Sequence, residues 1–180
     1  MSADAPQRGV PTDIFFSVGH AQTPEQQRFV AAVHALLVSH GLNPRTVGRT
    51  DFSSRKPLKR ILEVLRECSG TMVVALERVR IIRGLELQAQ PGVFPLADVR
   101  LPTVWNQVEA AMAYSLGQPL LAIVETGLRS EGLLEERYDW YVKWLDLNPD
   151  SLGDPGFLET FAEWKRKVED YQADHRLSGN

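Results

Sequence analysis

The feature that most constrains this chain is a repeated alternation of short apolar runs with longer segments of helical periodicity. Each run is short and nearly continuous, as in a buried strand, and the segments between them carry apolar residues every three or four positions. The predicted strands are 13–18, 43–47, 71–76, 120–124 and 138–147. A chain organised in this way folds into an α/β structure, a parallel sheet joined by right-handed helical crossovers.

Helix boundary signals support this assignment. Thr23 followed by Pro24, with Gln26 three residues after the threonine, predicts a capped helix start. Gly41 is typical of the position just past a helix end. Apolar residues at helical spacing then predict the buried stripe of this first helix, at Phe29, Val33, Leu36 and Leu37.

The helix that follows the third strand is the one that bears on function. Thr103 is a suitable cap for it, and Gly117 and Pro119 mark its end. Its apolar spacing predicts that Val104, Val108 and Met112 form the buried stripe.

The order of the five strands can also be predicted. Five units of this size favour the flavodoxin-like order 2-1-3-4-5, with helices on both faces of the sheet. Pro44 favours an edge position for the second strand. Residues 78–102 interrupt the alternation with a connection far longer than usual, which predicts a lid, an added hairpin or an association surface. We therefore expect a flexible leader over 1–12 and one domain over 13–175, with an insertion at about 78–102.

Composition excludes several classes of protein. The net charge of −3 makes nucleic acid an unlikely partner, and the single cysteine excludes a disulfide framework and a cysteine-built zinc site. No apolar run is long enough to cross a bilayer, and the first residues lack a secretory pattern. Glycine-rich phosphate motifs, H-E-x-x-H and G-x-S-x-G are all missing. We expect a cytoplasmic protein with no membrane contact, no metal site and no required cofactor.

The candidate binding residues follow from the predicted topology. In open α/β sheets, ligands bind beyond the carboxyl ends of the strands, where the strand order reverses. The residues expected at this edge include Gly19 and His20 after the first strand, Arg49 and Asp51 after the second and Arg78 after the third, together with Trp105, Asn106 and Glu109 in the first turns of the next helix. Each also has a structural interpretation: a glutamate early in a helix can simply complement the helix dipole, and a tryptophan can simply pack.

Two segments resemble known families. Asp13-Ile14-Phe15-Phe16-Ser17 resembles the D-x-F-x-S strand that opens TIR (Toll/interleukin receptor) domains. Trp105-Asn106-Gln107-Val108-Glu109, followed by Leu116-Gly117-Gln118-Pro119 before a strand, resembles a pattern of nucleoside 2-deoxyribosyltransferase-like and bacterial TIR-like proteins. The resemblance covers roughly residues 13–125.

The resemblance implies chemistry at an N-glycosidic bond, with Glu109 as the matching catalytic glutamate. It also implies that Phe16 and Ser17 line the floor of the site, that Trp105 shields the ring, and that Arg49 or Arg78 meets a pyrophosphate. The implied partner is a nucleotide or nucleoside, and members of such families also associate with copies of themselves.

Three interpretations stay open at this point. The first is hydrolysis of the nicotinamide–ribose bond of NAD, which one carboxylate can support because the pyridinium leaves without being protonated. The second is a nucleoside 2-deoxyribosyltransferase or N-ribohydrolase, for which a second acid such as Asp51, Glu77 or Glu125 would be required. The third is a non-catalytic module that oligomerises or senses nucleotides.

Overall fold

A computed structural model describes residues 11–47, 57–87 and 93–178 of the chain. The strands of these residues are β1 (Thr12–Val18), β2 (Leu42–Arg45), β3 (Thr71–Ala75), β4 (Val79–Leu87), β5 (Val93–Leu101), β6 (Leu120–Glu125) and β7 (Tyr141–Leu145). The α-helices are α1 (Pro24–Ser39), α2 (Pro57–Glu67), α3 (Val104–Ser115) and α4 (Pro155–Ser178). Two short 3-10 helices, Gly132–Leu134 and Pro149–Gly153, flank β7 in the sequence.

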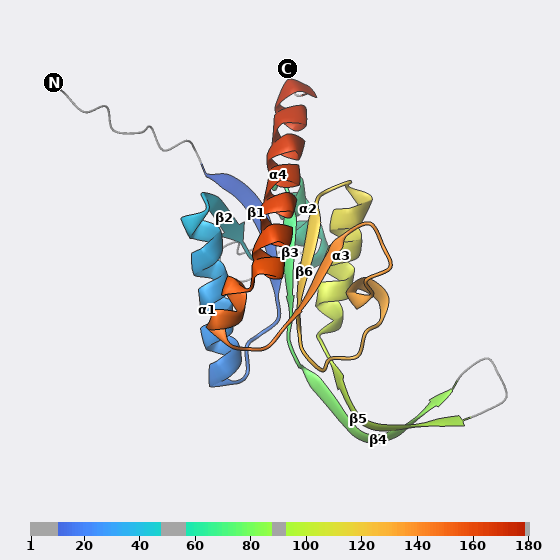
Figure 1. Cartoon of the computed structure of the whole chain (residues 1–180). Coiled ribbons are helices and arrows are strands. Elements are labelled where there is room, and N and C mark those ends of the chain that lie inside the picture. The colour runs from blue at the N-terminus through green and yellow to red at the C-terminus, as the bar shows by residue number, and fades with distance from the viewer. Residues whose placement is uncertain (1–10, 48–56, 88–92, 179–180) are drawn as a thin grey trace.

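The central sheet has five parallel strands in the order β2-β1-β3-β6-β7 (Figure 1). This is the flavodoxin-like order predicted from the sequence, with the hairpin strands β4 and β5 left out of the count. β2 contains Pro44 and lies at an edge, as expected. β1 begins at Thr12, one residue earlier than predicted, and Phe15 in its middle pairs with Arg45 of β2 and Thr71 of β3.

Helices cover both faces of this sheet. α1 and α4 pack on one face, where Phe16 of β1 joins Phe29 of α1 and Trp164 of α4 in one buried cluster. α2 and α3 pack on the other face, where Phe15 joins Leu65 of α2 and Ala113 of α3. Because side chains alternate along a strand, Ser17 lies on the same face as Phe15. Ser17 therefore faces α3, whereas Phe16 faces α1.

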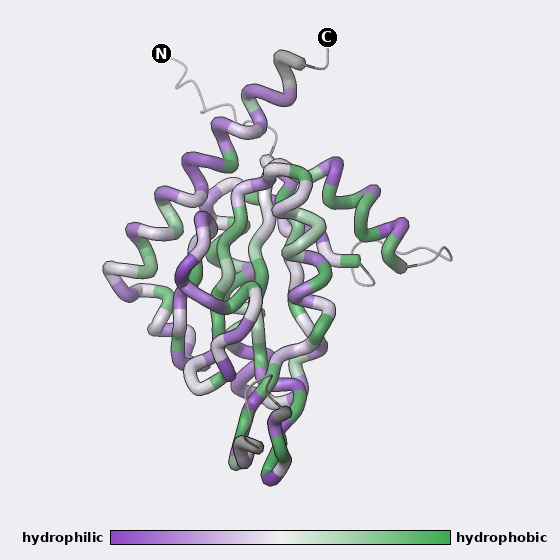
Figure 2. The backbone as a smooth tube through the Cα atoms, turned by 90° about the vertical axis from the view of Figure 1, so that its right-hand side faces the viewer, coloured by the Kyte–Doolittle hydropathy of each residue, from purple (hydrophilic) through white to green (hydrophobic). Residues whose placement is uncertain are grey.

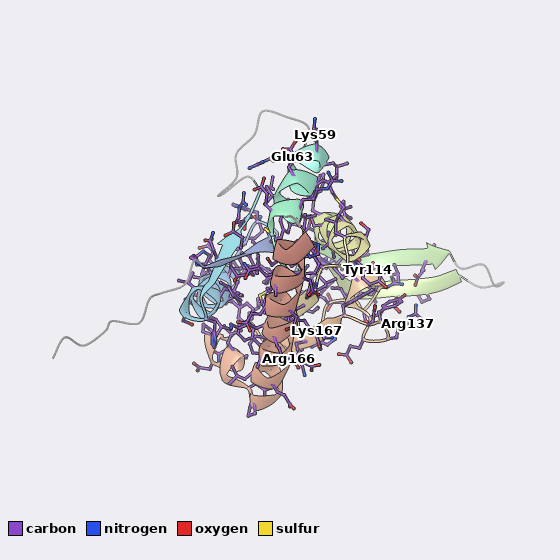
Figure 3. All side chains as sticks on the ribbon, turned by 90° about the horizontal axis from the view of Figure 1, so that it is seen from above. Lys59, Glu63, Tyr114, Arg137, Arg166 and Lys167 are labelled. Atoms are coloured by element: carbon purple, nitrogen blue, oxygen red, sulfur yellow. The ribbon has the colours of Figure 1, made fainter. Side chains whose placement is uncertain are left out.

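The distribution of polarity agrees with this layering. The residues of the central strands are mostly hydrophobic, and hydrophilic residues lie mainly on the helices around them (Figure 2). Seen from above, Lys59 of α2 and Arg166 of α4 lie on the outside of the molecule, where both are exposed (Figure 3). In the part of the chain that the structure describes, no helix combines the length and apolarity needed to span a bilayer.

The first helix begins and ends as its boundary signals predict. The Thr23 hydroxyl accepts a hydrogen bond from the Gln26 amide at 3.2 Å, and Gln26 Oε1 accepts one from the Gln22 amide at 2.8 Å. The chain leaves the helix through Gly41, whose φ of +76° lies in the region that favours glycine. Of the predicted stripe, Phe29, Val33 and Leu37 are buried, and Leu36 is partly buried against the same core.

The buried face of α3 differs from the prediction. Val104 is 73% exposed and Val108 is 37% exposed, whereas Asn106, Ala110 and Ala113 are buried. Alanine side chains are small and allow the helix to lie close to the sheet. The alanines therefore face the sheet, and the two valines face outward. One consequence is that Asn106 and Glu109, which share this row at helical spacing, also point inward.

The excursion predicted over 78–102 is an antiparallel hairpin of β4 and β5. Its register runs from Val79 opposite Leu101 to Leu87 opposite Val93, and it projects away from the sheet at the carboxyl ends of the strands (Figure 1). The Arg78 amide donates to the Leu101 carbonyl at 2.8 Å, so the hairpin closes at its base immediately before α3 starts.

Candidate functional site

A hollow of about 360 Å³ opens at the carboxyl ends of β1 and β3, where the strand order reverses. It lies between the loop after β1, the end of β3, α2 and the first two turns of α3. Its lining residues are Val18, Gly19, His20, Val47, Ile61, Arg78, Thr103, Trp105, Asn106 and Glu109. A volume of this size is at the small end of ligand sites, which run from roughly 300 to 1,000 Å³.

Glu109 is held from the side of the sheet. The Ser17 hydroxyl donates to Glu109 Oε2 at 2.5 Å and accepts from Asn106 Nδ2 at 2.8 Å. Asn106 Nδ2 also approaches the Ser17 carbonyl oxygen at 3.4 Å. Ser17 and Asn106 are each 1% exposed, so a buried chain of three polar side chains ends at the carboxylate in the hollow.

Burial raises the pKa of Glu109, and the hydrogen bond from Ser17 offsets part of that rise. Among the described residues, no cation lies within ion-pair distance of this carboxylate. Half-buried carboxylates in proteins are usually paired, since an isolated buried charge is costly. A perturbed, uncompensated carboxylate in a cleft is a mark of a functional site.

This pKa has a consequence for stability that can be measured. Between the ordinary glutamate value of 4.5 and the raised folded value, the folded chain holds a proton that the unfolded chain has lost. Stability contributed by the neutral Glu109 is therefore lost as the pH rises through this window. Glu109→Gln keeps the Ser17 hydrogen bond and removes the charge, so we expect it to raise the melting temperature at pH 7.

The same difference in melting temperature should shrink as the pH falls through this window and vanish well below pH 4.5, where Glu109 is protonated in both states. Glu163→Gln, at an exposed position on α4, is the matched control and should show no such pH dependence. Thermal melts of the three proteins across this pH range make the measurement. A wild-type protein more stable than Glu109→Gln at pH 7 would contradict the conclusion that burial disfavours the charged form of Glu109.

The structure brings together most of the residues predicted for the site. Gly19, Arg78, Trp105, Asn106 and Glu109 line the hollow, and Ser17 lies directly behind Glu109. Trp105 is 47% exposed and lies at the rim, so it is not a core packing residue. At Gly19, a Cβ atom would lie 3.2 Å from Thr103 Cγ2, which shows how closely the loop after β1 approaches the start of α3.

Three predicted residues do not contribute to the hollow as described. Phe16 is 2% exposed and packs on the α1 face of the sheet, so the prediction that it lines the floor of this hollow is wrong. The reason is strand alternation, since neighbours on β1 point to opposite faces. Arg49 and Asp51 lie outside the described residues.

A second hollow, of about 630 Å³, adjoins the first and shares Arg78 with it. It lies between the start of α1, the base of the hairpin and the end of β6. Arg78 is exposed and makes no side-chain hydrogen bond or ion pair with the described residues. The Arg78 side chain therefore lies between the two hollows, and a guanidinium is a group that can bind a phosphate.

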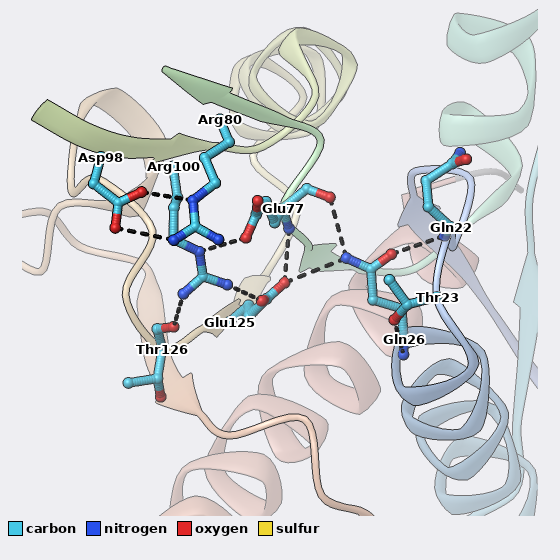
Figure 4. Close-up of polar contacts among 9 residues, drawn as sticks. All are labelled: Gln22, Thr23, Gln26, Glu77, Arg80, Asp98, Arg100, Glu125 and Thr126. Carbon is cyan, nitrogen blue, oxygen red and sulfur yellow. Dashed lines mark hydrogen bonds and ion pairs between the residues drawn. The ribbon is translucent and has the colours of Figure 1, made fainter. Parts of the chain in front are cut away.

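An ion-pair network forms the wall of this second hollow (Figure 4). The Arg100 guanidinium from β5 pairs with both Glu77 and Glu125, and it donates to the Thr126 carbonyl at 2.9 Å. Glu125 Oε2 also accepts from the Glu77 amide at 2.7 Å. Glu77 and Glu125, which were candidates for a second acid, are thus committed to holding the hairpin on the ends of β3 and β6.

One residue of the site, Arg100, was missed at the level of sequence. Arg100 was not singled out, because its partners lie 23 and 25 residues away and nothing local marks them. His20, which was expected at this edge of the sheet, also lines the hollow. No cluster of histidine, cysteine or carboxylate side chains suited to a metal ion occurs within the described ranges.

Comparisons with known proteins give few matches. No family model matches the chain, and no curated protein matches it. A solved structure of Clostridium botulinum CMP N-glycosidase, BcmB, is similar at 10% sequence identity and a TM-score of 0.44, covering 78% of this chain and 93% of that chain.

Proposed function

We propose that this protein hydrolyses the N-glycosidic bond of a nicotinamide nucleotide such as NAD, with Glu109 as the carboxylate that meets the ribose. The observation that carries the proposal is the half-buried Glu109 carboxylate, which faces a ligand-sized hollow without an ion-pair partner among the described residues. The resemblance of the α3 segment to TIR-like and deoxyribosyltransferase-like sequences supports the same role.

Cleavage of this bond requires one negative charge beside C1′ of the ribose. When the bond between ribose C1′ and the nicotinamide nitrogen breaks, its electron pair returns to the ring, which leaves neutral. Positive charge remains on the ribose as an oxocarbenium ion, and a carboxylate beside C1′ stabilises it. Water then adds to C1′ and gives up one proton, so the products are nicotinamide, ADP-ribose and a proton.

The surroundings of Glu109 favour this leaving group over purines and pyrimidines. A neutral base leaves as an anion unless an acid protonates it, whereas a pyridinium needs no acid. Glu77 and Glu125 are paired with Arg100, and Glu109 is the one carboxylate in the described lining of the smaller hollow.

The test is a substrate panel on the full chain. NAD, nicotinamide mononucleotide, CMP, AMP and 2′-deoxyadenosine are incubated with the protein, and the free base is quantified by chromatography. We expect nicotinamide release to exceed release of cytosine or adenine by at least about tenfold, because only nicotinamide leaves without protonation. Release of cytosine or adenine without release of nicotinamide would contradict the proposal and favour a nucleoside hydrolase or deoxyribosyltransferase.

A second candidate function is a non-catalytic module that associates with copies of itself. The hairpin supports it, because Ile82 is 65% exposed and Leu85 is 69% exposed on a ribbon that projects from the domain. The same panel separates the two functions. Sedimentation of a concentration-dependent oligomer, with no base released from any substrate, would favour the module.

A further inference from the structure

We infer that Asn106 is a positioning residue of the candidate site, which acts through Ser17 to orient and stabilise the Glu109 carboxylate. The catalytic significance of this role rests on the proposed function, whereas the positioning of Glu109 can be measured without a substrate. It also changes the role expected of Asn106 and Ser17: both were predicted to bind substrate, whereas the geometry assigns them to the support of Glu109.

The first step concerns the orientation of the Asn106 amide. The atom that faces Ser17 lies 3.4 Å from its backbone carbonyl oxygen and 2.8 Å from its hydroxyl oxygen. A backbone carbonyl can only accept a hydrogen bond, so the atom facing it must be the amide nitrogen. Asn106 therefore donates to Ser17.

The second step concerns the one proton of the Ser17 hydroxyl. Because Ser17 Oγ accepts from Asn106, its proton is directed to the other polar neighbour, Glu109 Oε2, at 2.5 Å. Without Asn106, the hydroxyl could rotate away from the carboxylate. Ser17 holds Oε2, and none of the described residues hydrogen-bonds Oε1. Oε1 is then the oxygen left for a ribose in the hollow.

The third step concerns the carbonyl oxygen of Asn106, which this arrangement leaves unpaired. Asn106 is 1% exposed, and its carbonyl oxygen Oδ1 is buried without a hydrogen-bond partner among the described residues. Buried carbonyls of this kind are rare, since leaving one unpaired is unfavourable. An apolar side chain would avoid that cost at this inward-facing position of α3. The presence of asparagine is accounted for by what its amide nitrogen does for Ser17 and Glu109.

The test is a titration of Glu109 that requires no substrate. The full chain is labelled with ¹³C-glutamate, the side-chain carboxyl signal of Glu109 is identified by its loss in Glu109→Gln, and its pKa is measured by NMR. We expect Ser17→Ala to raise this pKa by about one pH unit, because a hydrogen bond to the charged form is lost. Asn106→Leu should raise it in the same direction by at least about half as much.

The double variant decides whether Asn106 acts through Ser17. With Ser17→Ala in place, Asn106→Leu should add no further shift, whereas two independent effects would add. Gln107→Leu is the matched control: Gln107 bonds the loop at Glu131 and Leu133, and its loss should leave the Glu109 titration unchanged. Asn106→Asp serves as a nearly isosteric second variant, and its added negative charge should raise the pKa further than Asn106→Leu does.

The inference is overturned if Asn106→Leu and Asn106→Asp both leave the measured pKa of Glu109 unchanged. It is also overturned if the Asn106→Leu shift is undiminished in the Ser17→Ala background. Neither result depends on turnover. Absence of base release from every nucleotide would contradict the proposed function, but it would not affect this titration.

Discussion

Replacing Glu109 by glutamine is expected to reduce nicotinamide release at least about a thousandfold, the scale on which electrostatic stabilisation of a transition state is lost. Glutamine has the same shape and keeps an oxygen to accept from Ser17, but it carries no negative charge for the ribose cation. The reduction should appear in both kcat and kcat/KM, because the missing interaction is strongest in the transition state.

The matched control for activity is Glu163→Gln, which makes the same chemical change at an exposed position on α4. It should release nicotinamide at the wild-type rate. Circular dichroism and a thermal melt of Glu109→Gln establish that the fold is intact. A Glu109→Gln protein that keeps activity within about tenfold of wild type would show that this carboxylate does not carry the reaction.

The second large effect concerns stability. Arg100→Met is expected to lower the free energy of unfolding by about 3 kcal/mol, because it leaves the Glu77 and Glu125 carboxylates without their cation. The Glu125 side chain is only 8% exposed, so water does little to compensate for the lost partner. Urea denaturation of the wild type and the variant measures the difference.

Arg80→Met supplies the comparison. Arg80 pairs with Asp98 on the same hairpin, but the two side chains are 51% and 60% exposed, and such a pair contributes less than about 1 kcal/mol. In Arg100→Met, the further change Glu125→Gln should recover part of the loss, since it removes an uncompensated buried charge. Equal costs for Arg100→Met and Arg80→Met would contradict a structural role for the network.

Much of the fold could be predicted from local patterns. The apolar runs located the strands, and the number and size of the strand–helix units favoured the strand order that the structure has. The capping residues Thr23 and Thr103 and the glycine at 41 each lie where a helix starts or ends. These features depend on neighbours a few residues apart, which is why one sequence is enough to detect them.

The rotation of α3 could not be predicted in the same way. Hydrophobicity favours valine in the interior, but how closely a helix approaches a sheet depends on the size of the residues between them. Ala110 and Ala113 allow the close approach, and Val104 and Val108 are left outside. The inward position of Asn106 follows from this rotation, so its link to Ser17 was hidden as well.

Contacts between distant segments were also beyond the sequence. Ser17 and Glu109 are separated by 92 residues, and the fold alone brings them within hydrogen-bonding distance. Arg100 meets Glu125 for the same reason, across the base of the hairpin. The resemblance to known families pointed to Glu109, but only the structure shows what holds it.

The central claim is that the hollow in front of Glu109 holds a nucleotide ribose. A crystal structure of the Glu109→Gln variant with NAD bound tests it most directly. We expect C1′ of the nicotinamide ribose to lie within about 4 Å of the side chain at position 109, with the nicotinamide ring against Trp105. NAD bound only elsewhere on the molecule, or with its ribose turned away from position 109, would contradict the claim.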